Sequence, residues 1–168
     1  MRKLLACVPL LALAGCVLPL NASTAQHEFS PAGDPDAPQL ALLEFRIERE
    51  YVRYGSARLL CAAVGRADAQ QPLAEEDQQR LMIRFPALAP LSRCEMREGE
   101  YVDAITGEPA AVIELFDFTC DTATRCHGSA GFRYGANVAG FTIYDLEYAG
   151  YWRVREEPNN IVLTGDGA

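Results

Sequence analysis

The side chains with the most chemistry to offer in this chain are its carboxylates. Twenty-three Asp and Glu residues stand against 15 Lys and Arg, and two carboxyl groups facing one sugar can hydrolyse a glycosidic bond. Glu114 and Asp117 are three residues apart on a predicted strand, so they point to opposite faces. Asp145 and Glu147 share a face, which we expect to be exposed to solvent. A carboxylate-based glycan hydrolase is therefore the weakest of our hypotheses, and we expect no catalytic residue and no enzyme.

Nucleophiles and bases for other mechanisms are scarce. Of the two histidines, His27 and His127, the first falls in a segment that we predict to be a tether and cannot serve a Ser-His-Asp triad reliably. His127 is then the one histidine left for any catalytic role. Lys3 is the only lysine. The rest of the chain therefore has no amine side chain for Schiff-base chemistry or for lysine-dependent phosphate binding. The sequence has no H-E-x-x-H zinc motif. We expect no metal and no cofactor.

The first residues have the pattern of a bacterial export signal. Arg2 and Lys3 are followed by an apolar run over residues 4–15, which is the charged and hydrophobic arrangement of a signal peptide. The alternative is an uncleaved membrane anchor. Even when extended through Leu20, the apolar run is interrupted by Pro9 and Pro19 and falls short of the roughly 20 residues that a spanning helix needs.

The apolar run ends in Leu13-Ala14-Gly15-Cys16, which resembles the lipobox of bacterial lipoproteins. The resemblance implies cleavage before Cys16 and acylation of its thiol and amine with fatty acids such as palmitate. In lipoproteins of Gram-negative bacteria, a residue other than Asp after the lipidated cysteine implies transport to the periplasmic face of the outer membrane. Residue 17 is Val, so the resemblance implies this location. Several acyl chains give a firm anchor, at about 0.8 kcal/mol per buried methylene. Cleavage after Ala25 by the ordinary signal peptidase remains the alternative.

Composition suggests how the chain is divided. We predict a signal peptide over 1–15, a flexible lipid-anchored tether over 16–39, where prolines and small polar residues show no apolar period, and a single domain over 40–168.

Loss of Arg2 and Lys3 with the signal peptide takes the net charge from −8 to −10. An acidic chain without a basic cluster is unsuited to nucleic acid, so we expect the membrane, through the lipid, and an envelope protein as partners.

Four cysteines remain after Cys7 and Cys16 are assigned to the signal and the lipid. An even number in an oxidising compartment indicates two disulfides. Of the three pairings we favour Cys61–Cys94, joining a helix to the start of a sheet, and Cys120–Cys126, closing a short loop. A zinc site is the alternative, although the spacing has no paired C-x2-C motifs.

Hydrophobic periodicity predicts an α+β fold. Apolar residues recur at steps of three and four over 40–64, which predicts one long amphipathic helix that places Cys61 on its apolar face. The start of this segment also alternates like a strand. Residues 73–83 begin acidic and end basic, which predicts a short helix. Aromatic and β-branched residues then predict an antiparallel β-meander of four to five strands packed against the helices, with strands over 100–105, 110–119, 132–138, 141–148 and 151–155.

The last hairpin is specific enough for a predicted register. A three-residue loop over 148–150 places a glycine where left-handed backbone is favoured. This register pairs Leu146 with Trp152 and Asp145 with Arg153, and makes Trp152 a core residue rather than a ligand platform. The pattern Tyr144-x-Leu146 followed by Gly150-x-Trp152-x-Val154 is also similar to the last hairpin of several NTF2-like secreted domains. The single long N-terminal helix that we predict differs from the usual set of helices in those domains.

Two functions without catalysis remain. The first is a protein-binding module such as an inhibitor, an immunity factor or an assembly factor, because an acidic domain associates quickly with a basic partner. Our candidate binding patch for it lies around the first predicted hairpin and consists of Glu98, Glu100, Asp103 and Glu108. A solvated strand edge, protected from aggregation by its charges, explains the same residues.

The second function is a small-ligand carrier or sensor. It requires a hollow between helix and sheet, and Tyr51, Tyr54, Tyr144 and Tyr148 are the residues that would line it. We expect these tyrosines to be ordinary core residues with hydroxyls at the rim. A large apolar cavity would favour the carrier, and an acidic exposed surface with aromatic residues would favour the binding module.

Overall fold

The computed structural model describes residues 30–54, 58–66, 68–137 and 139–162, and the side chains of all of these except 51–54 and 158–162. The predicted signal peptide, the lipobox and Cys16 lie outside this part. The elements are η1 (Pro31–Gly33), α2 (Pro38–Tyr54), β1 (Leu59–Val64), β2 (Gln71–Pro72), α3 (Glu75–Arg84), β3 (Leu88–Ala89), η2 (Leu91–Arg93), β4 (Cys94–Arg97), β5 (Glu100–Asp103), β6 (Ala110–Thr122), β7 (Arg125–Arg133), β8 (Ala139–Tyr148) and β9 (Trp152–Val162).

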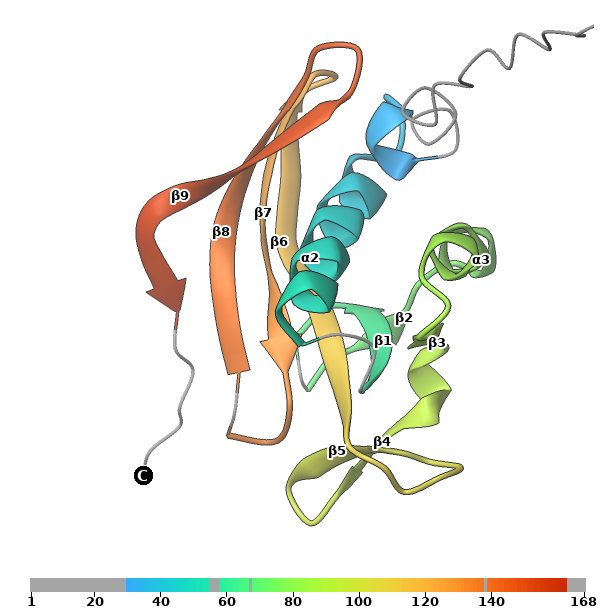
Figure 1. Ribbon diagram of the computed structural model, residues 1–168. Coiled ribbons are helices and arrows are strands. Elements are labelled where there is room, and N and C mark those ends of the chain that lie inside the picture. Colours follow the sequence, from blue (N-terminus) through green and yellow to red (C-terminus); the bar gives the residue numbers. More distant parts are fainter. Residues whose placement is uncertain (1–29, 55–57, 67, 138, 163–168) are drawn as a thin grey trace, which may run out of the picture.

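The fold is α+β, with two α-helices in the described ranges and a mixed sheet as its centre (Figure 1). The strand order is β2-β1-β6-β7-β8-β9, and β3 also pairs with β1. Strands β6 to β9 are antiparallel neighbours, whereas β1 runs parallel to both β3 and β6. The predicted antiparallel meander of four to five strands is therefore wrong, because the chain inserts a parallel strand beside β6.

The predicted long helix over 40–64 is also wrong. Helix α2 ends at Tyr54, and β1 begins at Leu59. Leu60, Cys61, Ala62 and Ala63 are all buried, as expected for a strand covered on both faces. When every residue of a segment is apolar, the apolar residues fit a helical spacing and a strand spacing equally well. The steps of three and four that continued into β1 were therefore no evidence for a helix there. The short helix is confirmed as α3, which begins with three acidic residues and ends with Arg84.

Part of the predicted tether is folded. Ser30 and Pro31 are buried, and the Ser30 hydroxyl donates to the carboxylate of Glu44 on α2 at 2.7 Å. The indole N–H of Trp152 donates to the Asp34 carbonyl at 2.8 Å. Two of the prolines that suggested disorder, Pro31 and Pro38, begin η1 and α2 instead, because a fixed φ suits the first turn of a helix.

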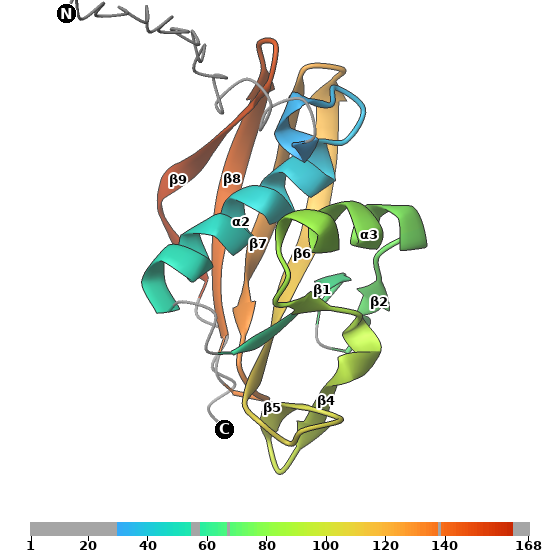
Figure 2. The same ribbon diagram turned by 45° about the vertical axis from the view of Figure 1, so that its right-hand side comes forward.

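Two hydrophobic cores lie on opposite faces of the sheet. The larger one fills the space beneath α2 and α3, which cover one face (Figure 2). The smaller one contains Cys61, Cys94, Tyr101 and Val112. The Cys61–Cys94 disulfide is present as predicted, although it joins β1 to β4 rather than a helix to a sheet.

The upper ends of the β6–β7 and β8–β9 hairpins extend beyond the first turn of α2 (Figure 1). The predicted Cys120–Cys126 disulfide is present, and it links directly paired residues of β6 and β7. The predicted register of the last hairpin is wrong by two residues, because Tyr148 pairs with Trp152 and the loop is 149–151. A shift of two keeps each side chain on its face, so Trp152 is a core residue as predicted, with 3% exposure.

Neither helix in the described ranges is long and apolar enough to cross a membrane.

Candidate functional site

The predicted binding patch is only partly a surface. Glu98, Glu100 and Glu108 are exposed on and beside the β4–β5 hairpin, whereas Asp103 is buried at 4% exposure. Asp103 must therefore be removed from the patch. Its pairing with an arginine of η2 was not visible in the sequence, because the two residues are ten positions apart in an irregular segment.

Asp103 is a structural carboxylate. It accepts both hydrogen bonds of the Arg93 fork, at 2.8 and 2.6 Å, and bonds at 3.0 Å from the Ile105 N–H and the Thr106 hydroxyl. The Arg93 hydrogen bond, supported by the Ile105 N–H, holds the pKa of Asp103 well below its usual range. This carboxylate is fully used inside the fold and leaves nothing to offer a partner.

The space between α2 and the sheet is packed. Leu42, Leu43, Ile47 and Tyr144 are each 0% exposed there. Burial raises the pKa of the Tyr144 phenol, and the partly buried Tyr148 donates to the Gly33 carbonyl at 3.3 Å. The side chains of Tyr51 and Tyr54 lie outside the described part. The tyrosines that are described serve as core, as the sequence suggested.

The candidate catalytic carboxylates are dispersed. Glu114 is fully buried and pairs with Arg133 at 2.7 Å, while the exposed Asp117 pairs with Arg66 at 2.9 Å. Glu147 pairs with Arg155 at 3.0 Å, where the sequence suggested Asp145 opposite Arg153. In the described ranges no group of three or more His, Cys, Asp or Glu side chains is arranged to hold a metal.

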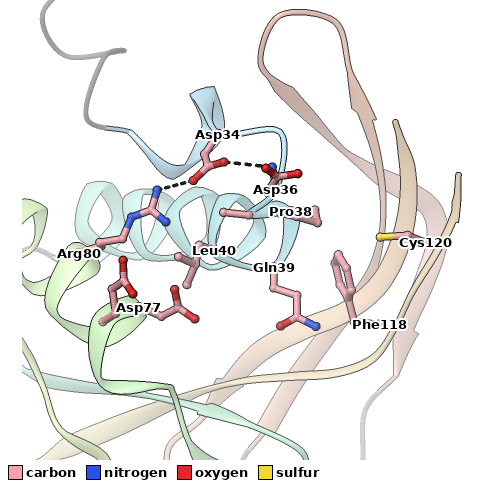
Figure 3. Close-up of a pocket in the computed structure, with 11 residues that line it drawn as sticks. Asp34, Asp36, Pro38, Gln39, Leu40, Asp77, Arg80, Phe118 and Cys120 are labelled. Carbon is pink, nitrogen blue, oxygen red and sulfur yellow. Dashed lines mark hydrogen bonds and ion pairs between the residues drawn. The ribbon is translucent and has the colours of Figure 1, made fainter. Parts of the chain in front are cut away.

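A concave site of about 550 Å³ lies where η1, α2, α3 and β6 meet. We call it the acidic groove. Figure 3 shows Asp77 and Arg80 of α3 on one side, Phe118 and Cys120 of β6 on the other, and the first turn of α2 between them. It is lined by four carboxylates, one guanidinium and an aromatic ring, namely Asp34, Asp36, Glu76, Asp77, Arg80 and Phe118.

The groove is electrostatically unbalanced. Arg80 pairs with Asp34 at 2.8 Å, and this pair is the one ion pair that we find within it. Asp36, Glu76 and Asp77 have no ion-pair partner among the described residues. Carboxylates gathered without counter-charges produce a negative potential that attracts cations and basic side chains. The groove therefore presents charge outward, unlike the buried Asp103 of the hairpin.

The groove continues along β6 into a second hollow, because Gln39 and Phe118 line both. This second hollow of about 390 Å³ is bordered by Arg66, Asp68 and Asp117. Together the two hollows follow the strand from Phe116 to Cys120. A ligand lying in them would be elongated and parallel or antiparallel to β6.

One side of β6 is open at this point. Strand β1 pairs with β6 only as far as Leu115, which accepts a last backbone bond from Gly65 at 2.8 Å. At Gly65 the backbone φ is +96°, and the Cβ of another residue would come within 2.4 Å of the Ala69 carbonyl. The chain therefore turns away, and no described strand pairs with that side of residues 116–122. We call this stretch the open edge of β6.

Sequence reasoning missed the groove because its parts come from three distant segments. The acidic first turn of α3 was visible, but as a feature that suits the helix dipole. Asp34 and Asp36 were assigned to the tether, and Phe118 to an ordinary strand. One signal was available: Gly65 directly after a continuous apolar run marks the point where a buried strand ends.

The chain matches no protein-family model, no curated protein and no solved structure at a significant level.

Proposed function

We propose that this protein is a lipoprotein of the outer membrane, anchored through Cys16, that binds a basic envelope protein through the acidic groove. Its role is that of an inhibitor, an immunity factor or an assembly factor. The observation that carries the proposal is an open groove whose carboxylates Asp36, Glu76 and Asp77 have no counter-charge in the described part of the chain. Charge of this kind increases the rate at which a basic partner associates.

The packing beneath α2 favours this proposal over the carrier. A carrier needs a hollow that encloses most of an apolar ligand. The described side chains fill that space, and Tyr144 is 0% exposed. The groove instead combines an aromatic side chain with exposed charges, which is the combination expected of a protein-binding surface.

The binding proposal is tested by reversing charge at two matched places. Asp36→Arg with Asp77→Arg alters the groove, and Glu98→Arg with Glu108→Arg alters the hairpin by the same total charge. The full-length mature lipoprotein and both variants are immobilised in detergent, and proteins captured from an envelope extract are quantified over a series of salt concentrations. We expect the groove variant to lose the partner by about 100-fold, roughly tenfold per reversed charge, and the hairpin variant to retain it. Equal losses in both variants would refute the groove as the site.

The lipid anchor is tested independently. Metabolic labelling with an alkyne analogue of palmitate should label the wild-type chain and leave Cys16→Ser unlabelled. Mass spectrometry of the mature N-terminus should show it beginning at an acylated Cys16. A mature protein beginning at Gln26, without label, would show that the ordinary signal peptidase cleaves instead.

A further inference from the structure

The open edge of β6 offers main-chain groups as well as charge. Residues 116–122 pair with β7 on one side, and on the other side β1 ends at the level of Leu115. An unpaired strand edge is a template for another extended chain, which adds to the sheet through backbone hydrogen bonds. The place next to this edge is the straight continuation of β1, and the acidic groove and its neighbouring hollow occupy it.

The charges around this edge select what can pair with it. Asp36, Glu76 and Asp77 line the groove, whereas Asp121, exposed on the edge strand itself, lies 3.5 Å from His127 and is not part of the groove lining. A second copy of this chain would bring the same carboxylates into contact, so the edge is protected against pairing with itself. A segment with arginine or lysine at alternate positions would place those side chains against the carboxylates, because alternate residues of a strand share a face.

The floor of the groove gives such a segment something to rest on. Leu40 is 3% exposed and Phe118 is half-buried against the main core. The aliphatic stem of an arginine or lysine can lie over these apolar atoms while its charged end reaches the rim. A short loop or a helix would satisfy the charges but would leave the backbone groups of the open edge unpaired.

We propose that the partner inserts an extended, basic segment as an additional β-strand along the open edge of β6. The inference rests on the proposed function and specifies how the partner is held. Two features limit the length of the pairing, since β6 has one irregularity between Phe116 and Thr119, with Asp117 at a φ of 51°, and a second between Cys120 and Thr122. Regular pairing is therefore expected to be short and centred on Thr119 and Cys120, and the bulge bends the strand before it.

The test uses synthetic peptides and the full-length mature lipoprotein. The probe is an acetylated and amidated peptide of alternating arginine and valine, eight residues long. In one control peptide every arginine is N-methylated on the backbone, and in the other every valine is. Both controls keep the charge, but each removes the N–H groups from one side of the strand. Binding is measured by isothermal titration calorimetry, and amide protection by hydrogen exchange.

We expect the unmodified peptide to bind and to protect amides within 116–122. One methylated peptide should lose at least about tenfold in affinity, because several backbone hydrogen bonds are lost together. The other should bind nearly as well as the parent, since its methyl groups face away from the sheet. Equal binding by all three peptides would overturn strand addition, and the proposed function would still stand if Asp36→Arg with Asp77→Arg abolished that binding. Failure of all three peptides to bind would overturn strand addition and the basic specificity of the groove.

Discussion

Residues 110–115 of β6 are paired on both sides, with β1 and β7, whereas residues 116–122 are paired only with β7. The two halves also differ in how they use carboxylates. In the closed half, Glu114 is 0% exposed and held by Arg133. Beside the open half, three of the four carboxylates of the acidic groove lack a counter-charge, and of these Asp36 and Glu76 are exposed and Asp77 is half-buried. Charge neutralised inside the fold stabilises a structure, and charge left without a partner is available for recognition.

Nearby polar groups reinforce the closed half. Gln70 donates to Glu114, and Tyr101 donates to Gln70 at 3.2 Å. Arg133 also donates to the Ala136 carbonyl at 3.3 Å and lies 5.4 Å from the centre of the Phe141 ring. A charged group buried this deeply is tolerated only when its partners are complete.

The largest expected effect comes from breaking the closed half. Arg133→Met leaves Glu114 buried without its guanidinium and should lower the free energy of unfolding by about 3–5 kcal/mol. Glu114→Leu added to Arg133→Met should restore most of this loss, because the remaining buried charge is gone. Urea denaturation followed by circular dichroism measures both. The exposed pair of Arg155 and Glu147 provides the control, since Arg155→Met should change stability by less than about 1 kcal/mol. Equal effects of Arg133→Met and Arg155→Met would contradict the distinction between buried and exposed charge.

The two disulfides provide the next comparison. Cys61–Cys94 closes a separation of 33 residues beside the closed half, and Cys120–Cys126, which begins within the open half, closes a separation of 6. Loop entropy predicts losses of about 4 and about 2 kcal/mol for the respective double alanine variants. Thermal and urea denaturation under oxidising conditions measure the two losses in free energy of unfolding. A larger loss for Cys120→Ala with Cys126→Ala than for Cys61→Ala with Cys94→Ala would contradict the prediction.

Both disulfides and α3 were predictable from the sequence, because they depend on cysteine count and on local charge order. The β1 strand was not, since a run such as Leu59–Val64 is apolar on every face and carries no period. The folding of Ser30 and Pro31 was not predictable either, because its cause is the distant Glu44. The acidic groove depends on these same missed elements, and for that reason it could not be assembled from the sequence.

Acid should weaken the fold at the β4–β5 hairpin, where Asp103 pairs with Arg93. Its folded pKa lies below its unfolded value, so its contribution to stability is complete above the unfolded pKa of about 3.9 and is lost as the pH falls below it. We expect wild type to be more stable than Asp103→Asn from pH 5 to 7 and the difference to shrink below about pH 4. Urea denaturation from pH 2 to 7 measures this, and a difference that stays constant down to pH 2 would contradict the assignment.

The smallest effects concern two residues with left-handed backbone, one in the β4–β5 turn and one in the open half of β6. Glu98 in the β4–β5 turn has a φ of 53°, and Asp117 in the β6 bulge has a φ of 51°. Because aspartate tolerates left-handed backbone better than glutamate, Glu98→Gly should stabilise the protein by about 0.5–1 kcal/mol and Asp117→Gly by less. Differential scanning calorimetry can resolve the two, and destabilisation by Glu98→Gly would contradict the strain.

The most direct test of the groove uses the absence of lysine after Lys3. A carbodiimide joins carboxylates to lysines at zero length. The chain after Lys3 offers no lysine to its own carboxylates, so these carboxylates report on a partner's lysines. Intact envelopes are treated with the reagent, and the cross-linked peptides are sequenced by mass spectrometry. We predict cross-links at Asp36, Glu76 and Asp77 that disappear at high salt. Cross-links concentrated at Glu98, Glu100 and Glu108, or none to any envelope protein, would contradict the account.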